Sequence, residues 1–258
     1  MHFLPFNELL LTLALGAGLG FFGGLFGIGG GIIAIPLLVL GFGMEQPLAQ
    51  GTALVLMVPN LLIGWWRYNQ RHPLAWHHAL LIGVSATLTT WLVAHFATQL
   101  DPRILRWLFS LFIGLLALRL LIRNHRRAEV GERPLQVSAL PLVGMLGGGT
   151  MGLLGIGGGL IAIPFLTGWL GQRQTVAQSL SLALAVPSSI IALLTYAGAG
   201  RVDWSLGLPL AVGGLFTVSA GVALAHRLPE KRMRAAFAWL MLATAFWLSI
   251  GQFLIHRL

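Results

Sequence analysis

The sequence contains no cysteine and very few charged residues. Without cysteine, the chain has no disulfide bond, no thiol nucleophile and no thiolate metal ligand. Charged side chains make up 9% of the 258 residues, whereas a soluble domain carries roughly 25%. Hydrophobic residues make up 57%, and the mean hydropathy is +0.84. These values exclude a soluble enzyme, a disordered chain and a disulfide-stapled secreted domain. They indicate an all-α polytopic membrane protein.

Acidic residues are scarce, and none lies well inside an apolar segment. All seven are near segment ends or in loops: Glu8, Glu45, Asp101, Glu129, Glu132, Asp203 and Glu230. Cation carriers and proton relays usually place Asp or Glu within the membrane. This distribution argues against a cation carrier and agrees with a small anionic substrate. It leaves no clear carboxylate for proton coupling, which stays open.

No pattern in the sequence favours an enzyme, a resident metal ion or a cofactor. The zinc motif His-Glu-x-x-His is absent, and no serine stands in a recognisable nucleophile setting. His77 and His78 lack an accompanying carboxylate or cysteine, so an interfacial position explains them better. The net charge of +9 comes from basic residues between apolar segments. It therefore indicates membrane topology and anionic lipid headgroups rather than nucleic acid.

Two uncharged runs are too long to be single membrane helices. Residues 9–44 and 134–172 would reach roughly 54 Å and 58 Å as straight helices, against a hydrocarbon core of about 30 Å. Six other segments each fit one spanning helix: 46–66, 72–100, about 104–122, 174–200, 204–226 and 235–256. Each long run contains a glycine-rich stretch followed by a proline, so we expect each to break there.

The glycine-rich stretches belong to an internal duplication with an offset of 128 residues. Gly24 to Pro36 matches Gly152 to Pro164, and the match extends to Pro59 and Pro187 and to further pairs. We expect a first repeat at 1–122, a basic linker at 123–134 and a second repeat at 135–258. Each repeat is predicted to contain a Gly-broken hairpin followed by three spanning helices.

The basic residues favour inverted over parallel repeats. If each long run crossed the membrane once, the Lys and Arg residues would divide nine against seven. If each run folds back as a hairpin, they divide twelve against four, which fits the positive-inside rule. We therefore expect inverted repeats in the inner (plasma) membrane, with the linker in the cytoplasm and both termini outside. The first ten residues contain no Lys or Arg, so we expect the first apolar run to belong to the mature protein.

The glycine-rich breaks are the first candidates for a substrate site. A helix that restarts after such a break presents backbone N–H groups and the positive end of its dipole. In inverted repeats the two helix starts would face each other near the membrane midplane and would suit an anion. Close helix packing by small residues is the structural alternative, but matched breaks in two overlong runs favour the site. The candidate residues are Gly29, Gly30, Gly31, Gly157, Gly158 and Gly159.

Uncharged polar side chains in the segments after the breaks are the second group of candidates. Gln50 and Gln178 occupy matched positions, as do Asn60 and Ser188. Amides and hydroxyls can donate hydrogen bonds to an oxyanion without carrying charge. Hydrogen bonding between helices is the alternative role. For the glutamines the two roles are equally supported. For the serines we favour hydrogen bonding between helices.

The duplicated block resembles a known family over essentially the whole chain. Its pattern Gly-x-x-Gly-x-Gly-Gly-Gly-x-x-x-x-Pro, with an Ala-Gln pair after each copy, looks like the TauE/SafE family of membrane permeases. The second half adds Tyr196-Ala197-Gly198-Ala199-Gly200-Arg201-Val202-Asp203-Trp204. The resemblance implies export of small sulfur-containing anions such as sulfite, sulfoacetate and related organosulfonates. Residues 69–75 depart from the pattern, because the expected Gly-x-Val-Asp is absent from the first half, so Asp203 receives no role.

The resulting hypothesis is an alternating-access exporter that binds its anion between the two breaks. Three alternatives stay open: a channel with the same site, a permease for another small anion such as a carboxylate, and a membrane scaffold without transport. The sequence does not determine the anion, the direction of net flux, the coupling ion or the oligomeric state.

Overall fold

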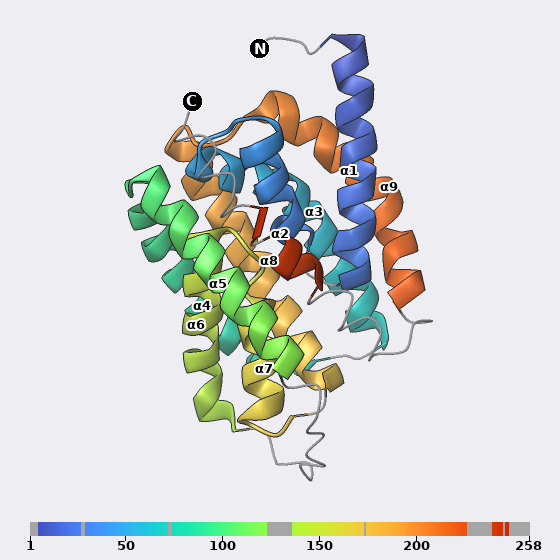
Figure 1. Cartoon of the computed structure of the whole chain (residues 1–258). Helices are drawn as coiled ribbons and strands as arrows, with labels where there is room; N and C mark the ends of the chain where they lie inside the picture. The colour runs from blue at the N-terminus through green and yellow to red at the C-terminus, as the bar shows by residue number, and fades with distance from the viewer. Residues whose placement is uncertain are drawn as a thin grey trace.

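The computed structural model describes residues 5–26, 29–71, 74–122, 136–172, 174–225, 239–244 and 246–247. These residues form helices and short connections, with no strand among them, which confirms the predicted all-α class (Figure 1). The helices are α1 (Phe6–Phe26), α2 (Gly31–Pro36), α3 (Gln46–Arg71), α4 (Trp76–Ala97), α5 (Pro102–Ile122), α6 (Leu140–Leu154), α7 (Gly159–Gly168), α8 (Gln174–Gly198) and α9 (Trp204–Ala225). A π-helical turn, η1 (Leu37–Gly41), extends α2, and a 3-10 turn, η3 (Val137–Ala139), precedes α6. The predicted linker at 123–134 lies outside the described residues.

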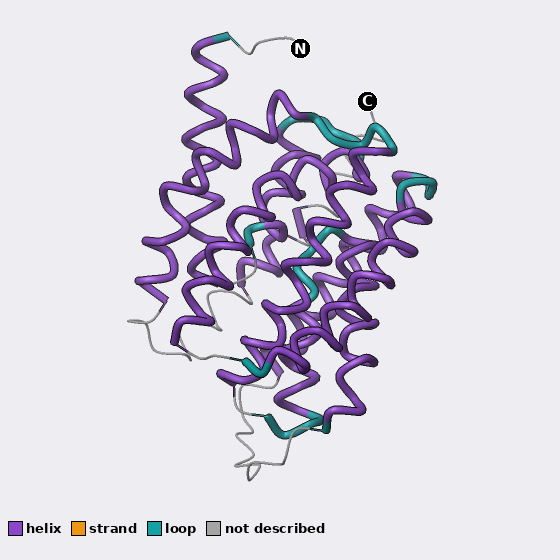
Figure 2. The backbone as a smooth tube through the Cα atoms, turned by 180° about the vertical axis from the view of Figure 1, so that it is seen from behind, coloured by secondary structure: helices purple, strands orange, loops and turns teal. Residues whose placement is uncertain are grey.

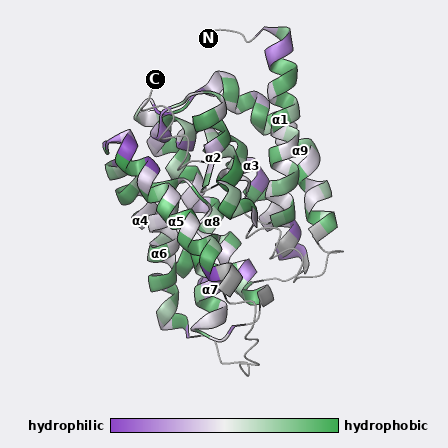
Figure 3. Cartoon of the chain, viewed as in Figure 1, coloured by the Kyte–Doolittle hydropathy of each residue, from purple (hydrophilic) through white to green (hydrophobic). Residues whose placement is uncertain are grey.

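Six of the described helical segments are long and apolar enough to cross a membrane. They are Phe6–Phe26, Gln46–Arg67, Trp76–Ala97, Val137–Leu154, Val176–Gly198 and Trp204–Leu224. Large apolar side chains such as Leu88, Trp91 and Phe216 are exposed on the outside of the bundle. Figure 3 shows hydrophobic residues over most of the helix length and hydrophilic ones gathered towards the ends. An exposed apolar surface of this kind is stable against lipid, so the chain is a multi-pass membrane protein.

Both overlong runs break at their glycine-rich stretches, as predicted from the sequence. The first run is divided between α1, which ends at Phe26, and α2, which begins at Gly31. The second is divided between α6, which ends at Leu154, and α7, which begins at Gly159. Neither α2 with η1 nor α7 is long enough to span a bilayer, since α2 has 6 residues, η1 has 5 and α7 has 10.

The helix directions show that the first broken run turns back on itself. On α1 and α9, Gly16 lies against Leu210 and Gly20 against Gly214, so these two helices run parallel. On α3, Gly51 lies against Arg201 at the start of α9, while Gly214 lies against Leu56, so α3 also runs parallel to α9. Because α1 and α3 point the same way, the chain between them must return, as the traces in Figures 1 and 2 show.

The second half packs in the same manner with the opposite direction. On α6, Gly148 lies against Ala86 and Gly152 against Thr90, so α6 runs parallel to α4. The helices α3 and α8 cross antiparallel, because Gln50 contacts Tyr196 and Gly64 lies nearest Leu182. The first long helix of each half, α1 or α6, therefore packs on the third long helix of the other half, α9 or α4.

The helix order repeats with constant spacing. Three pairs of helices, α2 and α7, α3 and α8, and α4 and α9, begin at residues that are 128 apart. An inverted duplication would produce this spacing together with the opposed directions of the two halves. The duplication itself stays an interpretation, which we develop with the proposed function.

Candidate functional site

The first break is built from glycines in backbone conformations that other residues avoid. Gly29 has φ of 71° and Gly30 has φ of 93°, both in the left-handed region. The chain at this point lies against α1, since a Cβ on Gly23 would come within 2.8 Å of the Gly30 nitrogen. The Gly30 carbonyl then accepts hydrogen bonds from the N–H groups of Ile33 and Ala34, at 3.1 and 3.0 Å, which closes the first turn of α2.

The second break begins with Gly155, which also has a left-handed φ of 64° and caps α6. The N–H of Leu160 donates to the Gly157 carbonyl at 3.1 Å, and that of Ala162 donates to the Gly158 carbonyl at 3.1 Å. Gly158 packs on the carbonyl of Gly147 in α6, and Gly159 packs on the Ser181 hydroxyl of α8. Gly158 and Gly159, two of the three glycines predicted as site residues in the second half, therefore allow the start of α7 to pack closely on α6 and α8.

The two breaks meet in the interior of the molecule. A Cβ on Gly31 would lie 3.2 Å from the carbonyl oxygen of Gly155 and would collide with Met57 of α3. A Cβ on Gly155 would lie 3.2 Å from Cβ of Gln50, and one on Gly29 would lie 3.1 Å from Leu61. One face of α3 thus lines both breaks, with Gln50 beside the second and Met57 and Leu61 beside the first.

Gln50 is the polar centre of this region. Its side chain is fully buried, and its Oε1 accepts a hydrogen bond of 2.8 Å from the hydroxyl of Tyr196 on α8. The same hydroxyl lies 3.1 Å from the Gly152 carbonyl of α6. With Oε1 placed towards Tyr196, Nε2 lies buried without a hydrogen-bond partner.

Two other buried amides on α3 also have no partner. Asn60 is 3% exposed and Gln46 is 0% exposed, and all four of their amide atoms lack a hydrogen bond. Gln46 lies one helical turn before Gln50, so the two side chains share a face of α3. Leaving a buried polar group unsatisfied costs about 1–3 kcal/mol. A polar ligand or water that supplies the missing partners would remove this penalty.

The second half offers a different set of polar groups. The Ser188 hydroxyl is buried and donates to carbonyls of its own helix, at 2.5 Å to Leu184 and 3.3 Å to Ala185. Gln178 is half-buried and is not free of partners. Within the described chain, the unpartnered amides therefore belong to the first half. Their matched positions in the sequence made Gln50 and Gln178 equivalent candidates for binding an anion. In the structure, their surroundings differ.

Sequence reasoning did not single out Gln46, Gly155 or Tyr196 as site residues. A signal existed for each: Gln46 matches Gln174, Gly155 stands in the duplicated block, and Tyr196 matches Tyr68. Their role depends on contacts between helices of different halves, which matched positions do not reveal. No group of three or more His, Asp and Glu residues with metal-ligand spacing is found in the described ranges.

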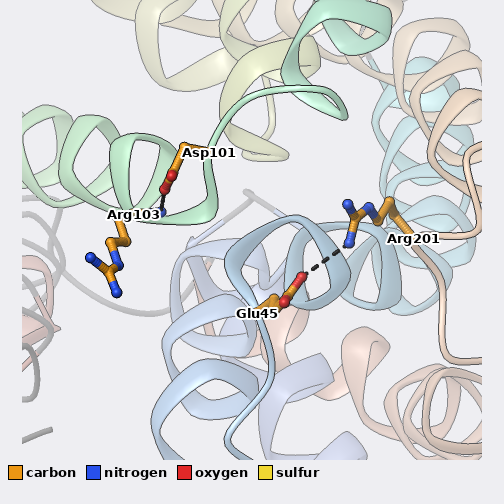
Figure 4. A network of polar contacts seen from close by, with 4 residues as sticks. All are labelled: Glu45, Asp101, Arg103 and Arg201. Carbon is orange, nitrogen blue, oxygen red and sulfur yellow. Dashed lines mark hydrogen bonds and ion pairs between the residues drawn. The ribbon is translucent and has the colours of Figure 1, made fainter.

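Charged residues lie at the end of the bundle where α3 begins. Arg201, in the connection between α8 and α9, donates to Glu45 just before α3 at 3.0 Å (Figure 4). The N–H of Asp203 donates to the Thr52 hydroxyl at 2.9 Å. The Asp203 carboxylate accepts from the N–H groups of Ser205 at 2.9 Å and Leu206 at 3.3 Å, so it caps the start of α9.

Comparison with known proteins gives one consistent result. Residues 12–248 match the family described as "Sulfite exporter TauE/SafE". A "Probable membrane transporter protein" of Xylella fastidiosa (strain Temecula1) is 29% identical over 93% of this chain and 95% of its own length. A protein of the same description from Methanocaldococcus jannaschii is 27% identical over 90% of this chain and 92% of its own length. Another from Haemophilus influenzae is 27% identical over 93% of this chain and 97% of its own length. No solved structure matches the chain.

Proposed function

Because the chain belongs to the TauE/SafE sulfite exporter family, we propose that it exports a small sulfur-containing anion by alternating access. The chain is a multi-pass membrane transporter of this family rather than an enzyme. The anion we propose is sulfite, sulfoacetate or a related organosulfonate, and the membrane is the plasma membrane. The observation that carries the proposal is the contact between the two glycine breaks beside Gln50, whose buried Nε2 has no hydrogen-bond partner.

The proposed anion site lies where the breaks meet. Its walls are the helix starts at Gly29, Gly30 and Gly31 and at Gly157, Gly158 and Gly159, with Gln50 and Asn60 on the α3 side. Gln178 and Ser188 line the α8 side. The donors are amide and backbone N–H groups, which complement the several oxygen atoms of a sulfite or sulfonate without a fixed positive charge. Neutral donors also favour release, since a buried cation would hold the anion more tightly.

The opposed directions of the two halves support alternating access. In an inverted pair of repeats, the site lies between two bodies whose rearrangement exposes it first to one side and then to the other. We propose that the linker end faces the cytoplasm, as the division of basic residues suggests. Expelling an anion from a negative interior is downhill by about 2.3 kcal/mol per charge at 100 mV, so the membrane potential alone suffices to drive export.

A binding and flux experiment tests this proposal. Purified protein is tested for thermal stabilisation by sulfite, sulfoacetate, taurine and lactate, and liposomes loaded with the same compounds are tested for efflux with and without a proton gradient. We expect saturable efflux of sulfite or a sulfonate over lactate, and loss of thermal stabilisation in the double variant Gln50→Ala, Gln178→Ala. The control is Gln99→Ala, because Gln99 is exposed at the end of α4.

The other outcomes separate the alternatives. Efflux of lactate alone would keep an anion permease but reject the sulfur-containing substrate. Unchanged stabilisation of the folded double variant would reject the site. Absence of any efflux from folded protein would contradict the transport proposal for this panel of anions.

A further inference from the structure

A groove lies at the surface of the bundle between the ends of α5 and α7 (Figure 1). Its volume is about 430 Å³, and it is lined by Arg119 of α5 and by Pro164, Phe165, Gly168 and Trp169 at the end of α7. Pockets that hold small molecules span about 300–1,000 Å³. None of these lining residues belongs to the proposed anion site, so the groove is a separate feature of the molecule.

The groove lies at the end of the bundle where the linker joins α5 to α6. The helices α6 and α8 run parallel, because Gly147 lies against Leu184 while the Gly152 carbonyl, further along α6, lies 3.1 Å from the Tyr196 hydroxyl. The short helix α7 between them must therefore return towards the start of α6. Because α5 ends at Ile122, directly before the linker, the ends of α5 and α7 meet on the linker side.

The walls of the groove combine a cation with two aromatic rings. The rings of Phe165 and Trp169 meet edge to face, with their centroids 4.5 Å apart and their planes at 86°. Trp169 is 64% exposed, and Arg119, in the last turn of α5, is also exposed. Tryptophan and arginine at the ends of apolar helices lie at the depth of the lipid headgroups. The groove therefore presents a guanidinium group beside an apolar wall at that depth.

The end of α7 does not need Arg119 as a cap. The carbonyls of Phe165 and Leu166 accept hydrogen bonds from the N–H groups of Trp169 and Gln172, at 2.9 and 3.0 Å. The backbone thus satisfies these acceptors in the last turn of α7. The guanidinium group of Arg119 is available to a ligand in the groove.

The charge around the groove is positive. Within the described ranges, no Asp or Glu lines it. The linker sequence that follows α5, residues 123–134, contains four arginines and two glutamates. A zwitterionic headgroup would bring an ammonium group that finds no acid in the groove walls, whereas a headgroup with net negative charge is complementary to them.

The first half has no counterpart of the groove at its matched positions. At an offset of 128 residues, Leu37 stands in place of Phe165 and Gly41 in place of Trp169. A tryptophan corresponds to Arg119. The combination of a cation with an aromatic pair therefore belongs to the linker side. Under the proposed orientation this side is cytoplasmic, where the membrane leaflet carries a negative surface potential.

We propose that the groove binds an anionic phospholipid, with the lipid phosphate on Arg119 and the start of an acyl chain along Phe165 and Trp169. Basic pockets between membrane helices on the cytoplasmic side are typical sites for acidic lipid headgroups. The proposal goes beyond the proposed function, because it assigns a second site to a lipid rather than to the transported anion. The lipid contacts the end of α7, whose start at Gly159 forms part of the second break.

Thermal unfolding of the full chain in mixed micelles tests the proposal. Purified protein in dodecyl maltoside is titrated with dioleoylphosphatidylglycerol, with dioleoylphosphatidylcholine, and with glycerol phosphate, which has no acyl chain. We expect phosphatidylglycerol to raise the melting temperature at a lower concentration than phosphatidylcholine does. In Arg119→Gln the concentration of phosphatidylglycerol at half-maximal stabilisation should rise roughly fivefold, with no change for phosphatidylcholine.

Arg103→Gln is the matched control, because Arg103 is also exposed and lies at the opposite end of the same helix. Its response to phosphatidylglycerol should equal that of the natural protein. Equal losses in Arg103→Gln and Arg119→Gln would show a general effect of charge and would overturn the proposal. Arg119→Lys keeps the charge, so we expect it to retain the preference for phosphatidylglycerol.

Other outcomes would also reject the lipid. Equal stabilisation of the natural protein by the two lipids would show that the groove does not select a negative headgroup. Glycerol phosphate that protects as well as phosphatidylglycerol would identify a site for a soluble anion instead. Neither comparison involves transport, so the result is independent of which anion is exported.

A second variant keeps the proposal testable if Arg119→Gln does not fold. Trp169→Leu removes one aromatic wall and leaves Arg119 in place. Native mass spectrometry then counts the phosphatidylglycerol molecules that remain bound after release from the micelle. We expect Trp169→Leu to retain fewer of them than the natural protein, and an unchanged count would contradict the binding of lipid along this wall.

Discussion

At the scale of single residues, the hydroxyl of Tyr196 holds the candidate site together. It donates to Gln50 at 2.8 Å, lies 3.1 Å from the Gly152 carbonyl, and is fully buried, so one atom connects α3, α6 and α8. We predict that Tyr196→Phe lowers the free energy of unfolding by about 1–3 kcal/mol, because the buried Oε1 of Gln50 loses its donor.

A double-mutant cycle measures this contact. Thermal unfolding in detergent is compared for Tyr196→Phe, Gln50→Met and both together. If the hydroxyl acts through Gln50, the effects of the two substitutions should not add, since residues in contact are coupled. Additive effects would show that the hydroxyl does not act through this amide.

Gly155 is the second residue whose replacement has a definite expected effect. Its φ of 64° disfavours any residue with a Cβ, and an added Cβ would lie 3.2 Å from Cβ of Gln50. We predict that Gly155→Ala destabilises the protein by more than the roughly 1–2 kcal/mol of left-handed strain alone. Gly43→Ala is the control, because Gly43 has φ of 66° with nothing within 4 Å. Equal melting temperatures for the two variants would contradict the contact with Gln50.

At the scale of helices, two stripes of glycine set the packing between the halves. Gly16, Gly20 and Gly24 of α1 lie on the backbone of α9, and Gly144, Gly148 and Gly152 of α6 lie on the backbone of α4. Hydroxyl groups add to this packing, since Thr90 donates to the Gly148 carbonyl at 2.9 Å and Thr217 to the Ala17 carbonyl at 2.5 Å. Small residues allow such close backbone approach in membranes, where hydrophobic burial gives little driving force.

These contacts predict opposite effects for neighbouring glycines. We expect Gly20→Ala and Gly148→Ala to lower the melting temperature, because the added methyl would collide with the facing backbone. Gly18→Ala and Gly149→Ala meet nothing closer than 3.9 Å and should be neutral or stabilising by about 0.5–1 kcal/mol through helix propensity. The measurement is thermal unfolding, with size-exclusion profiles to check that each variant is folded. If all four variants changed the melting temperature by the same amount, the glycine stripes would not be the packing surfaces.

Much of the helix layout could be predicted from the sequence. Segment length, the glycine blocks and the offset of 128 residues gave the two breaks, and those signals depend only on distance along the chain. The pairing of α1 with α9 and of α4 with α6 could not be derived in this way. Glycines at every fourth position, such as Gly16 and Gly20, show that a helix can be approached closely, but they do not identify the helix that approaches.

The candidate site was predictable to a smaller extent. The contact of Gly31 with Gly155 brings the two breaks together, whereas the predicted anion site between the two helix starts stays a prediction. The amide of Gln46 and the bond from Tyr196 to Gln50 required knowledge of which side chains are buried and which of their atoms have partners. Such knowledge comes only from packing in three dimensions, because Gln46 and an exposed glutamine look alike in the sequence.

At the scale of the whole molecule, the proposed orientation can be tested with this cysteine-free chain. We predict that Gly41→Cys reacts with an impermeant thiol reagent in intact cells, whereas Gly131→Cys in the linker reacts only after the membrane is opened. The reason is the division of twelve basic residues against four under the hairpin topology. The reverse pattern would invert the proposed orientation.

The crossed packing of the halves also has a consequence for how the protein is made. The partner of α1 begins at Trp204, and α1 itself ends at Phe26. At about 5–20 residues per second, roughly 9–36 seconds of synthesis separate the two helices. Throughout that time the glycine stripe of α1 must be shielded by lipid, by the insertion machinery or by a temporary neighbour. Translation that stops after the first half would leave α1 in the membrane without α9, the helix that covers its glycine stripe.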